Sequence, residues 1–355
     1  MPTLYSPSDG TQIAERTLAS ANDIASALTN ASRGQAQWRQ IPLAERAHIC
    51  QQAINWFSAN QAMLARQISQ LMGRPIQYAQ GEIAGVKERG QYMIAIAEHA
   101  LQDLEIKDLK IKDLEIKDPT YKRLIRRVPL GTAFIIAPWN YPYLTAVNSI
   151  IPALMAGNSV ILKHASQTLL CAEQFAQAFQ AAGLPAGVFQ FLHLDHQQTI
   201  AALQEDAIHF VSFTGSLAAG KMIEKSLAGT LKPLALELGG KDPAYVRADA
   251  DLASSITSLV EGAFFNSGQS CCAIERIYVA EEIFSDFVKG FVAATKKLTL
   301  GHALDPSTSL GPMINQQAVK QAQQQIQDAV AAGAITHISA QDFPLDETLQ
   351  QQGSY

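Results

Sequence analysis

Two residues of different chemistry stand thirty-four positions apart and together supply both halves of a thiol-based oxidation. Cys271 lies in a Gly-Gln-Ser-Cys-Cys segment, and Glu237 lies in a Leu-Glu-Leu-Gly-Gly-Lys segment. A thiolate can attack a carbonyl carbon and hold the substrate covalently, and a carboxylate can activate the water that releases it. The pair therefore suggests a covalent mechanism with hydrolytic release.

Cys271 is the candidate nucleophile. Its small, polar flank, residues 266–270, is typical of a loop that lets a ligand approach closely. A free thiol has a pKa of about 8.5, so we expect an electropositive setting that favours the thiolate. The alternative is a buried core cysteine, which is the usual fate of an isolated one. We expect the adjacent Cys272 to be a packing neighbour.

Glu237 is the candidate general base, since it ends an apolar run and precedes two glycines. A carboxylate at a strand end beside flexible backbone can face a cleft and swing between positions. Partial burial would raise its pKa toward a useful range. The alternative is a salt-bridged surface glutamate, which spacing alone leaves open.

Asn140 follows Pro138 and Trp139 at the end of another apolar run. When a thiolate adds to an aldehyde, the carbonyl oxygen becomes an oxyanion. The Asn140 amide and the backbone N–H of Cys271 can stabilise that charge. An ordinary turn asparagine is the alternative.

Gly215 and Ser216, with Gly220 five residues after Gly215, stand between an expected strand and helix. Backbone N–H groups at a helix start, with the Ser216 hydroxyl, can bind a pyrophosphate. The pattern is not the full GxGxxG, so it is a weak signal alone. Lys163 also ends a strand and can bond cofactor hydroxyls or phosphate. The alternative is a solvated lysine.

The elements that must position these residues alternate between strand and helix from Gly131 onward. Apolar runs predict strands at 132–137, 159–163, 188–192, 208–213 and 234–238, with helices near 146–155, 168–182 and 215–227. This alternation predicts a mostly parallel sheet with helices on both faces. Ligands bind such sheets at the carboxyl ends of the strands, where Asn140, Lys163 and Gly215 fall. Residues 10–100 are expected to be helical, with clear periodicity at 44–57 and 61–71.

Residues 104–118 contain three tandem five-residue units, Leu-Glu-Ile-Lys-Asp, Leu-Lys-Ile-Lys-Asp and Leu-Glu-Ile-Lys-Asp. The two apolar residues of each unit stand two apart, as on one side of a strand. A solvated loop or edge ribbon is one interpretation. An element of subunit contact is the other.

The composition indicates a globular chain and argues against several classes of function. Of 355 residues, 48% are hydrophobic and 17% charged, and the net charge is −5 without a large basic block, so we expect no nucleic-acid partner. The start lacks a basic segment followed by an apolar run, and no uninterrupted apolar stretch of about 18 residues occurs, so we expect neither a secretory signal nor a membrane span. Four cysteines fit a reducing cytoplasm. The eight histidines show no metal-ligand spacing, so we expect no metal.

Together the segments resemble the NAD(P)-dependent aldehyde dehydrogenase superfamily from about residue 15 to residue 315, ending in Leu-Gly-Pro-Met-Ile at 310–314. The resemblance implies that a small-molecule aldehyde is oxidised to a carboxylic acid through a cysteine thiohemiacetal and thioester, with NAD or NADP as cofactor. By resemblance, the catalytic residues are Cys271, Glu237 and Asn140. The cofactor would be bound by Lys163, Ser166, Gly215, Ser216, Trp139 and Gly220.

The resemblance also implies a domain organisation. The fold class is α/β: a Rossmann-like parallel-sheet cofactor domain (1–103 and 128–239), a small β-ribbon oligomerisation element (104–127) and a second, incomplete α/β catalytic domain (240–355). For a full-length chain the resemblance implies a homo-oligomer. The family has no such triplicated repeat there.

The chain departs from the family pattern after Lys163. The family usually continues Lys-Pro-Ser-Glu, whereas this chain has His164, Ala165 and Ser166. A glutamate in place of Ser166 would bind the ribose diol and repel a 2′-phosphate. Binding of NADP is therefore compatible with this sequence, and we expect His164 to add positive charge beside the cofactor.

The chain also ends at Tyr355, whereas the family continues with a Glu-x-Phe-Gly-Pro motif that grips the nicotinamide ribose. The resemblance thus predicts a C-terminally truncated chain. Two hypotheses stay open: an aldehyde dehydrogenase, or an inactive fragment of that fold that at most binds a dinucleotide.

Overall fold

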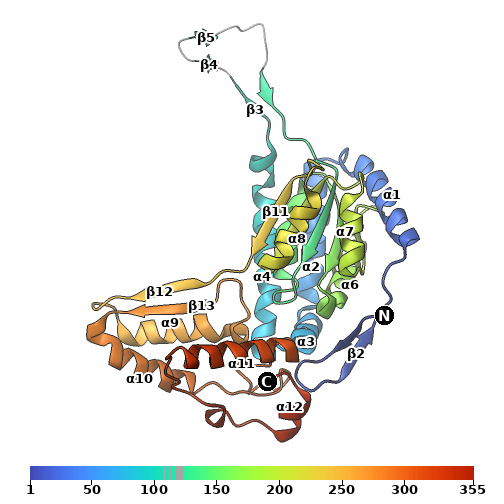
Figure 1. Ribbon diagram of the computed structural model, residues 1–355. Helices are drawn as coiled ribbons and strands as arrows, with labels where there is room; N and C mark the ends of the chain where they lie inside the picture. The colour runs from blue at the N-terminus through green and yellow to red at the C-terminus, as the bar shows by residue number, and fades with distance from the viewer. Residues whose placement is uncertain (107–108, 112–113, 117–122) are drawn as a thin grey trace.

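A parallel five-stranded sheet forms the centre of the structure, a computed structural model that describes residues 1–106, 109–111, 114–116 and 123–355 (Figure 1). The strand order is β11-β10-β7-β8-β9. In chain order the strands are β7 (Thr132–Ala137), β8 (Ser159–His164), β9 (Phe189–Phe191), β10 (Phe210–Gly215) and β11 (Leu234–Leu238). Every residue of β7 and β8 is buried, because helices cover both faces. The predicted parallel α/β sheet is confirmed.

The strand order reverses beside β7. The chain builds β7, β8 and β9 outward on one side, then returns to place β10 and β11 on the other side. In an open parallel sheet, this reversal leaves a crevice at the carboxyl ends of the two adjacent strands, where ligands bind. The strand β7 ends just before residues 138–140, and β10 ends at Gly215. The crevice therefore lies between two of the predicted motifs.

Two groups of helices cover the two faces of the sheet. Alternate residues of each strand face opposite sides, so Ile135 joins one apolar cluster and Phe134 the other. The Ile135 side is packed by α2 (Leu43–Ala59), α3 (Gln61–Met72), α4 (Ile76–Leu101), α5 (Leu144–Met155) and α6 (Leu169–Ala181). The Phe134 side is packed by α1 (Ala21–Trp38), α7 (His196–Gln204) and α8 (Leu217–Leu227). No helix in the described ranges is both long enough and apolar enough to cross a membrane.

A second group of strands and helices follows β11. The strands β12 (Asp242–Val246) and β13 (Ile274–Val279) pair in parallel, and Figure 1 shows them extending away from the central sheet beside α9 and α10. The helices are α9 (Leu252–Phe264), α10 (Phe284–Thr295), α11 (Gln316–Ala331) and α12 (Glu347–Gln352), with short 3₁₀ turns at Phe265–Gly268, Glu281–Ile283 and Ala340–Asp342. These elements correspond to the expected catalytic part, whose limits stay a prediction.

Short antiparallel strands occupy the region of the five-residue repeats. The strand β3 (Leu104–Glu105) pairs with β6 (Leu124–Ile125), and β4 (Leu109–Ile111) pairs with β5 (Leu114–Ile116). Figure 1 shows β3 leaving the end of α4 and leading away from the central sheet. The pairs agree with the ribbon interpretation, although residues 107–108, 112–113 and 117–122 lie outside the described residues. Subunit contact stays a prediction.

The N-terminal segment differs from its prediction in one place. Residues 12–15 form strand β2 (Gln12–Glu15), which pairs antiparallel with β1 (Thr3–Tyr5), whereas we expected helix from residue 10. The intervening turn is closed by the Ser6 N–H, which donates to the Thr11 carbonyl at 2.8 Å, and Gly10 adopts a φ of 70°. A segment of four residues carries too little periodicity to predict this pairing.

Candidate active site

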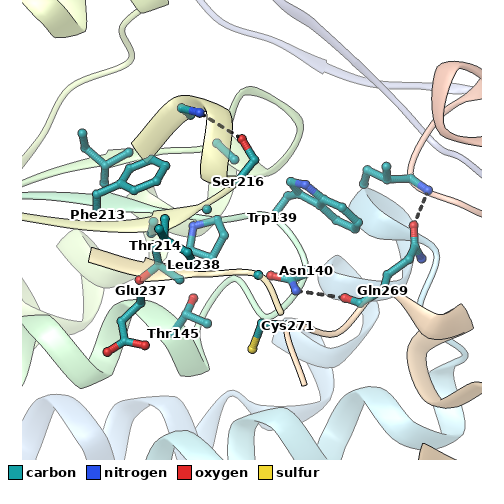
Figure 2. Close-up of a pocket in the computed structure, with 18 of the residues that line it drawn as sticks. Trp139, Asn140, Thr145, Phe213, Thr214, Ser216, Glu237, Leu238, Gln269 and Cys271 are labelled. Carbon is teal, nitrogen blue, oxygen red and sulfur yellow. Dashed lines mark hydrogen bonds between the residues drawn. The ribbon is translucent and has the colours of Figure 1, made fainter. Parts of the chain in front are cut away.

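A cavity of about 520 Å³ opens at the carboxyl ends of the central strands, beside the turn that precedes β13. Figure 2 shows the side chains that line it, which come from the ends of β7, β10 and β11 and from the segment around Cys271. Of the predicted site residues, those that line the cavity are Trp139, Asn140, Lys163, Ser166, Gly215, Ser216, Glu237 and Cys271. The structure thus brings together segments more than 130 residues apart.

The turn before Cys271 has an unusual backbone. Asn266, Ser267 and Gly268 have φ values of 55°, 57° and 70°, a left-handed conformation that costs non-glycine residues about 1–3 kcal/mol each. Hydrogen bonds hold it: Asn266 Oδ1 accepts from Arg74 Nε at 2.9 Å, and Ser267 Oγ donates to the Gly311 carbonyl at 2.9 Å. The surrounding structure therefore fixes this turn and with it the position of the thiol.

The Cys271 side chain is exposed to the cavity, so it is not a core cysteine. Partial burial and the neighbouring Cys272 raise the pKa of the thiol, while the backbone N–H groups of both cysteines oppose that shift. The described residues therefore do not supply the electropositive setting that we expected around the thiol, and that prediction is wrong. Cys272 is also exposed, so the expected packing role is wrong.

Glu237 lies on β11 opposite Thr214 of β10, and its side chain is exposed. Figure 2 shows its carboxylate and the Cys271 sulfur directed to the same side of the cavity, with Thr145 of α5 between them in the view. Three residues beyond Glu237, the Gly240 N–H donates to the Cys271 carbonyl at 3.1 Å. The candidate base and nucleophile therefore face a common space and share a backbone link.

The Asn140 amide is oriented from both ends. Its Nδ2 donates to the Gln269 carbonyl at 2.9 Å (Figure 2), and its Oδ1 accepts from the Tyr141 N–H at 3.1 Å. This pattern places the amide nitrogen on the side of the nucleophile turn. Because an amide carries two N–H donors, a second proton can serve a ligand in the cavity.

Lys163 and Ser166 lie at the carboxyl end of β8. Lys163 is only 7% exposed, and burial lowers the pKa of its amine while Asp195 opposes the shift. Its Nζ lines the cavity without a hydrogen-bond partner in the described part of the chain. A buried amine of this kind favours a hydroxyl or anionic ligand. Ser166 is exposed at the start of a 3₁₀ turn (Ser166–Thr168).

The expectation that His164 adds positive charge is wrong. The side chain is fully buried, and burial lowers its pKa to about 4. Its Nε2 lies 2.9 Å from the Pro142 carbonyl, and its Nδ1 accepts from the Ala165 N–H at 3.0 Å. Since Nδ1 already accepts a backbone proton, the ring is held neutral with its hydrogen on Nε2.

Of the three residues predicted around the turn after β10, Gly215 and Ser216 line the cavity, whereas Gly220 packs inside the structure. Ser216 is the N-cap of α8, where its Oγ accepts from the Ala219 N–H at 3.3 Å. A Cβ on Gly215 would lie 2.6 Å from the Phe213 ring, so a side chain there would require the ring to shift. Gly220 does not line the cavity, because it is buried in α8, where a Cβ would lie 2.7 Å from the Leu238 side chain. Its geometry is that of a helix-packing glycine, and its predicted cofactor contact gains no support.

Sequence reasoning missed two charged residues that support the site. Arg74 lies between α3 and α4, and Glu82 lies on α4; both side chains are almost fully buried and form an ion pair. Neither residue lies near a motif, so the sequence did not point to them. The one available signal was the Gly-Arg-Pro break between two expected helices. No group of three metal-ligating side chains occurs among the described residues.

Comparisons with known proteins show the family of the chain. The family model for the aldehyde dehydrogenase family matches residues 3–351. The succinate semialdehyde dehydrogenase [NAD(P)+] Sad of Escherichia coli (strain K12) is 33% identical over 328 residues, which cover 92% of this chain and 69% of that protein.

Two solved structures show the same fold. An aldehyde dehydrogenase from Brucella melitensis biovar abortus 2308 superposes with a TM-score of 0.89 at 28% identity, covering 95% of this chain and 68% of that one. PnpE in complex with nicotinamide adenine dinucleotide superposes with a TM-score of 0.91 at 26% identity, covering 99% and 70%. The chain therefore belongs to the aldehyde dehydrogenase family and is an NAD(P)-dependent enzyme of that class.

Proposed function

We propose that this chain oxidises an aldehyde to a carboxylic acid with NAD(P)⁺ through a thiohemiacetal and a thioester on Cys271. The observation that carries the proposal is a single cavity with two kinds of lining. Cys271, Glu237 and Asn140 lie around one part of it, and Lys163 and Ser216 lie at strand ends suited to a dinucleotide.

In the first step, the Cys271 thiolate adds to the aldehyde carbon. A C–S bond forms, and the carbonyl electron pair becomes an oxyanion. The Asn140 Nδ2–H and the Cys271 backbone N–H are the donors for that oxygen, and the loss of one such donor typically costs about 10²–10³ in rate. Because the Cys271 pKa is raised in the chain alone, formation of the thiolate must be assisted by Glu237 or by bound ligands.

The residues at the carboxyl ends of β8 and β10 fit a dinucleotide. The unpartnered amine of Lys163 can bond ribose hydroxyls, the Leu217 and Ala218 N–H groups at the start of α8 can bind the pyrophosphate, and Gly215 leaves space beside them. Bound NAD(P)⁺ supplies the acceptor for the hydride that leaves the former aldehyde carbon. Ser166 carries no charge that would repel a 2′-phosphate, so both NAD and NADP are accommodated.

In the last step, Glu237 takes a proton from a water molecule that attacks the thioester. The C–S bond breaks, the carboxylic acid leaves, and the thiol is restored. The exposed position of Glu237 on the cavity side of β11, followed by Gly239 and Gly240, allows the carboxylate to reach that water and then withdraw.

The test is NAD(P)H formation by the full chain with a panel of aldehydes. Succinate semialdehyde is the first candidate, because the matched Escherichia coli protein is named for it. Cys271→Ala should abolish turnover with every aldehyde that the wild-type chain oxidises. Undiminished turnover in that variant would refute the proposal, and dinucleotide binding without any wild-type turnover would favour a binding role instead.

A further inference from the structure

Arg74 links the helical layer to both turns that carry catalytic groups. It follows Gly73, which ends α3 at a φ of 81°, and precedes Pro75, the N-cap of α4. Its Nε donates to Asn266 Oδ1 at 2.9 Å, and its Nη2 donates to the Asn140 carbonyl at 2.6 Å. The guanidinium therefore contacts the turn before Cys271 and the turn after β7 at the same time.

The Tyr141 ring completes this environment. The Arg74 Cζ lies 4.3 Å from the centroid of the ring, and the Tyr141 hydroxyl lies 2.6 Å from Ser270 Oγ. In addition, Asn266 Nδ2 donates to the Asn140 carbonyl at 3.2 Å. The two turns are thus joined directly to each other, and both are joined through Arg74.

Glu82 connects the same network to α5. One carboxylate oxygen pairs with Arg74 Nη1, and the other accepts from the Tyr143 N–H at 2.7 Å and the Leu144 N–H at 3.1 Å. These amides open α5, which has no side-chain cap of its own, so the carboxylate takes that role. The helix carries Thr145 into the cavity.

A buried ion pair is a weak source of stability, because the desolvation of two charges offsets their attraction. Here the pair has further partners: Arg74 Nε and Nη2 donate to Asn266 and Asn140 of the two turns, and the second oxygen of Glu82 accepts from the first amides of α5. We propose that Arg74 and Glu82 are positioning residues, which hold the Asn140 amide and the Cys271 thiol in register for the reaction. This inference rests on the proposed roles of those two residues.

Arg74→Lys is the first test. Lysine keeps the positive charge beside Glu82, but its ammonium cannot bridge Asn266 and Asn140 as the planar guanidinium does. We expect kcat to fall about 10- to 100-fold, since a misplacement of about 1 Å can cost about 10² in rate. The KM for NAD(P)⁺ should stay within about threefold, because the network does not include Lys163 or Ser216.

Hydrogen exchange measures the positioning without any turnover. We expect amides at 140–145 and 266–273 to exchange at least about tenfold faster in Arg74→Lys, while those of α6 stay unchanged. The double variant Arg74→Met/Glu82→Met removes both charges together and should show the same two effects. If the lysine variant fails to fold, the double variant tests the positioning role instead, because it leaves no unpaired buried charge.

Arg16→Met is the matched control. Arg16 also bridges the N-terminal segment to a helix, through Glu173 at 2.6 Å, but neither residue lines the cavity. The kcat of Arg16→Met and its amide hydrogen exchange at 266–273 should equal those of wild type. Wild-type kcat and exchange in both network variants would overturn the inference. An inactive wild type would instead refute the proposed function, and the exchange data would still test the network.

Discussion

The Gly240 N–H donates to the Cys271 carbonyl at 3.1 Å, which joins the end of β11 to the nucleophile turn. Gly240 stands three residues after Glu237, so the bond couples the positions of the candidate base and nucleophile. A Cβ on Gly240 would lie 2.8 Å from Asp242 Oδ1 and 3.4 Å from the Cys271 carbonyl oxygen. The second glycine of the Leu-Gly-Gly segment thus serves close approach of two backbones.

Gly240→Pro should lower kcat about 10- to 100-fold, because proline removes the N–H that binds Cys271. Steady-state kinetics with a saturating cofactor measures the effect. Gly81→Ala is the control: no atom lies within 4 Å of its Cβ position on α4, so the variant should keep full activity and gain about 1 kcal/mol of stability. Equal activity of the two variants would show that the link is dispensable.

Glu237→Gln should separate the two chemical steps. The amide cannot accept a proton from water, so hydrolysis of the thioester should slow while the Cys271 step survives. Rapid mixing with excess aldehyde should show an initial burst of NAD(P)H close to one equivalent per site, followed by slow turnover. Loss of the burst together with turnover would contradict the assignment of Glu237 to deacylation.

Ser166→Glu should weaken the binding of NADP while sparing that of NAD. A carboxylate beside the adenosine ribose would repel a 2′-phosphate, and with solvent screening we expect the KM for NADP to rise about 30- to 100-fold. The KM for NAD should change little, because the ribose diol can bond the new carboxylate. Ser166→Ala is the control and should keep the wild-type ratio. An unchanged ratio in the glutamate variant would place the 2′-phosphate elsewhere.

The sequence was informative wherever a chemical motif follows an apolar strand. The runs at 132–137 and 234–238 coincide with β7 and β11, and their ends deliver Asn140 and Glu237 to one cavity. Parallel sheets make such predictions possible, since all carboxyl ends meet at the same edge.

The sequence did not reveal which polar side chains are buried or which distant residues pair. His164 adjoins a lysine in the sequence, yet full burial keeps it neutral. In the sequence, Arg74 looks like an ordinary charge in a helix break and Glu82 like one on a helix, and only the folded chain brings Arg74 to Asn266, 192 positions away. Gly220 shows the converse case, because a glycine near a motif turned out to serve helix packing.

The neutral His164 should make stability depend on pH. The pKa is about 4 in the folded chain, against an ordinary value of 6.5, so the unfolded chain binds a proton first as pH falls. The stabilisation is full above pH 6.5 and is lost between pH 6.5 and about 4, with a total on the order of 3 kcal/mol. Urea unfolding across this range measures the slope.

His164→Gln should reduce the pH dependence of the free energy of unfolding by an amount that corresponds to about one proton, whatever its effect on absolute stability. His337→Gln is the control, because His337 is exposed and should leave the slope unchanged. An identical pH dependence in wild type and His164→Gln would mean that His164 titrates normally in the folded protein.

The ribbon should form a contact between subunits. Leu104 on β3 is paired with Ile125 on β6, and these side chains are 55% and 51% exposed. Paired strands that leave adjacent apolar side chains in water are typical of an interface. Ile125→Asp should therefore shift a homo-oligomer toward a smaller species in size-exclusion chromatography with light scattering. Met63→Asp, at an exposed apolar position on α3, should not. A wild-type chain that is monomeric at every concentration would exclude this role for the ribbon.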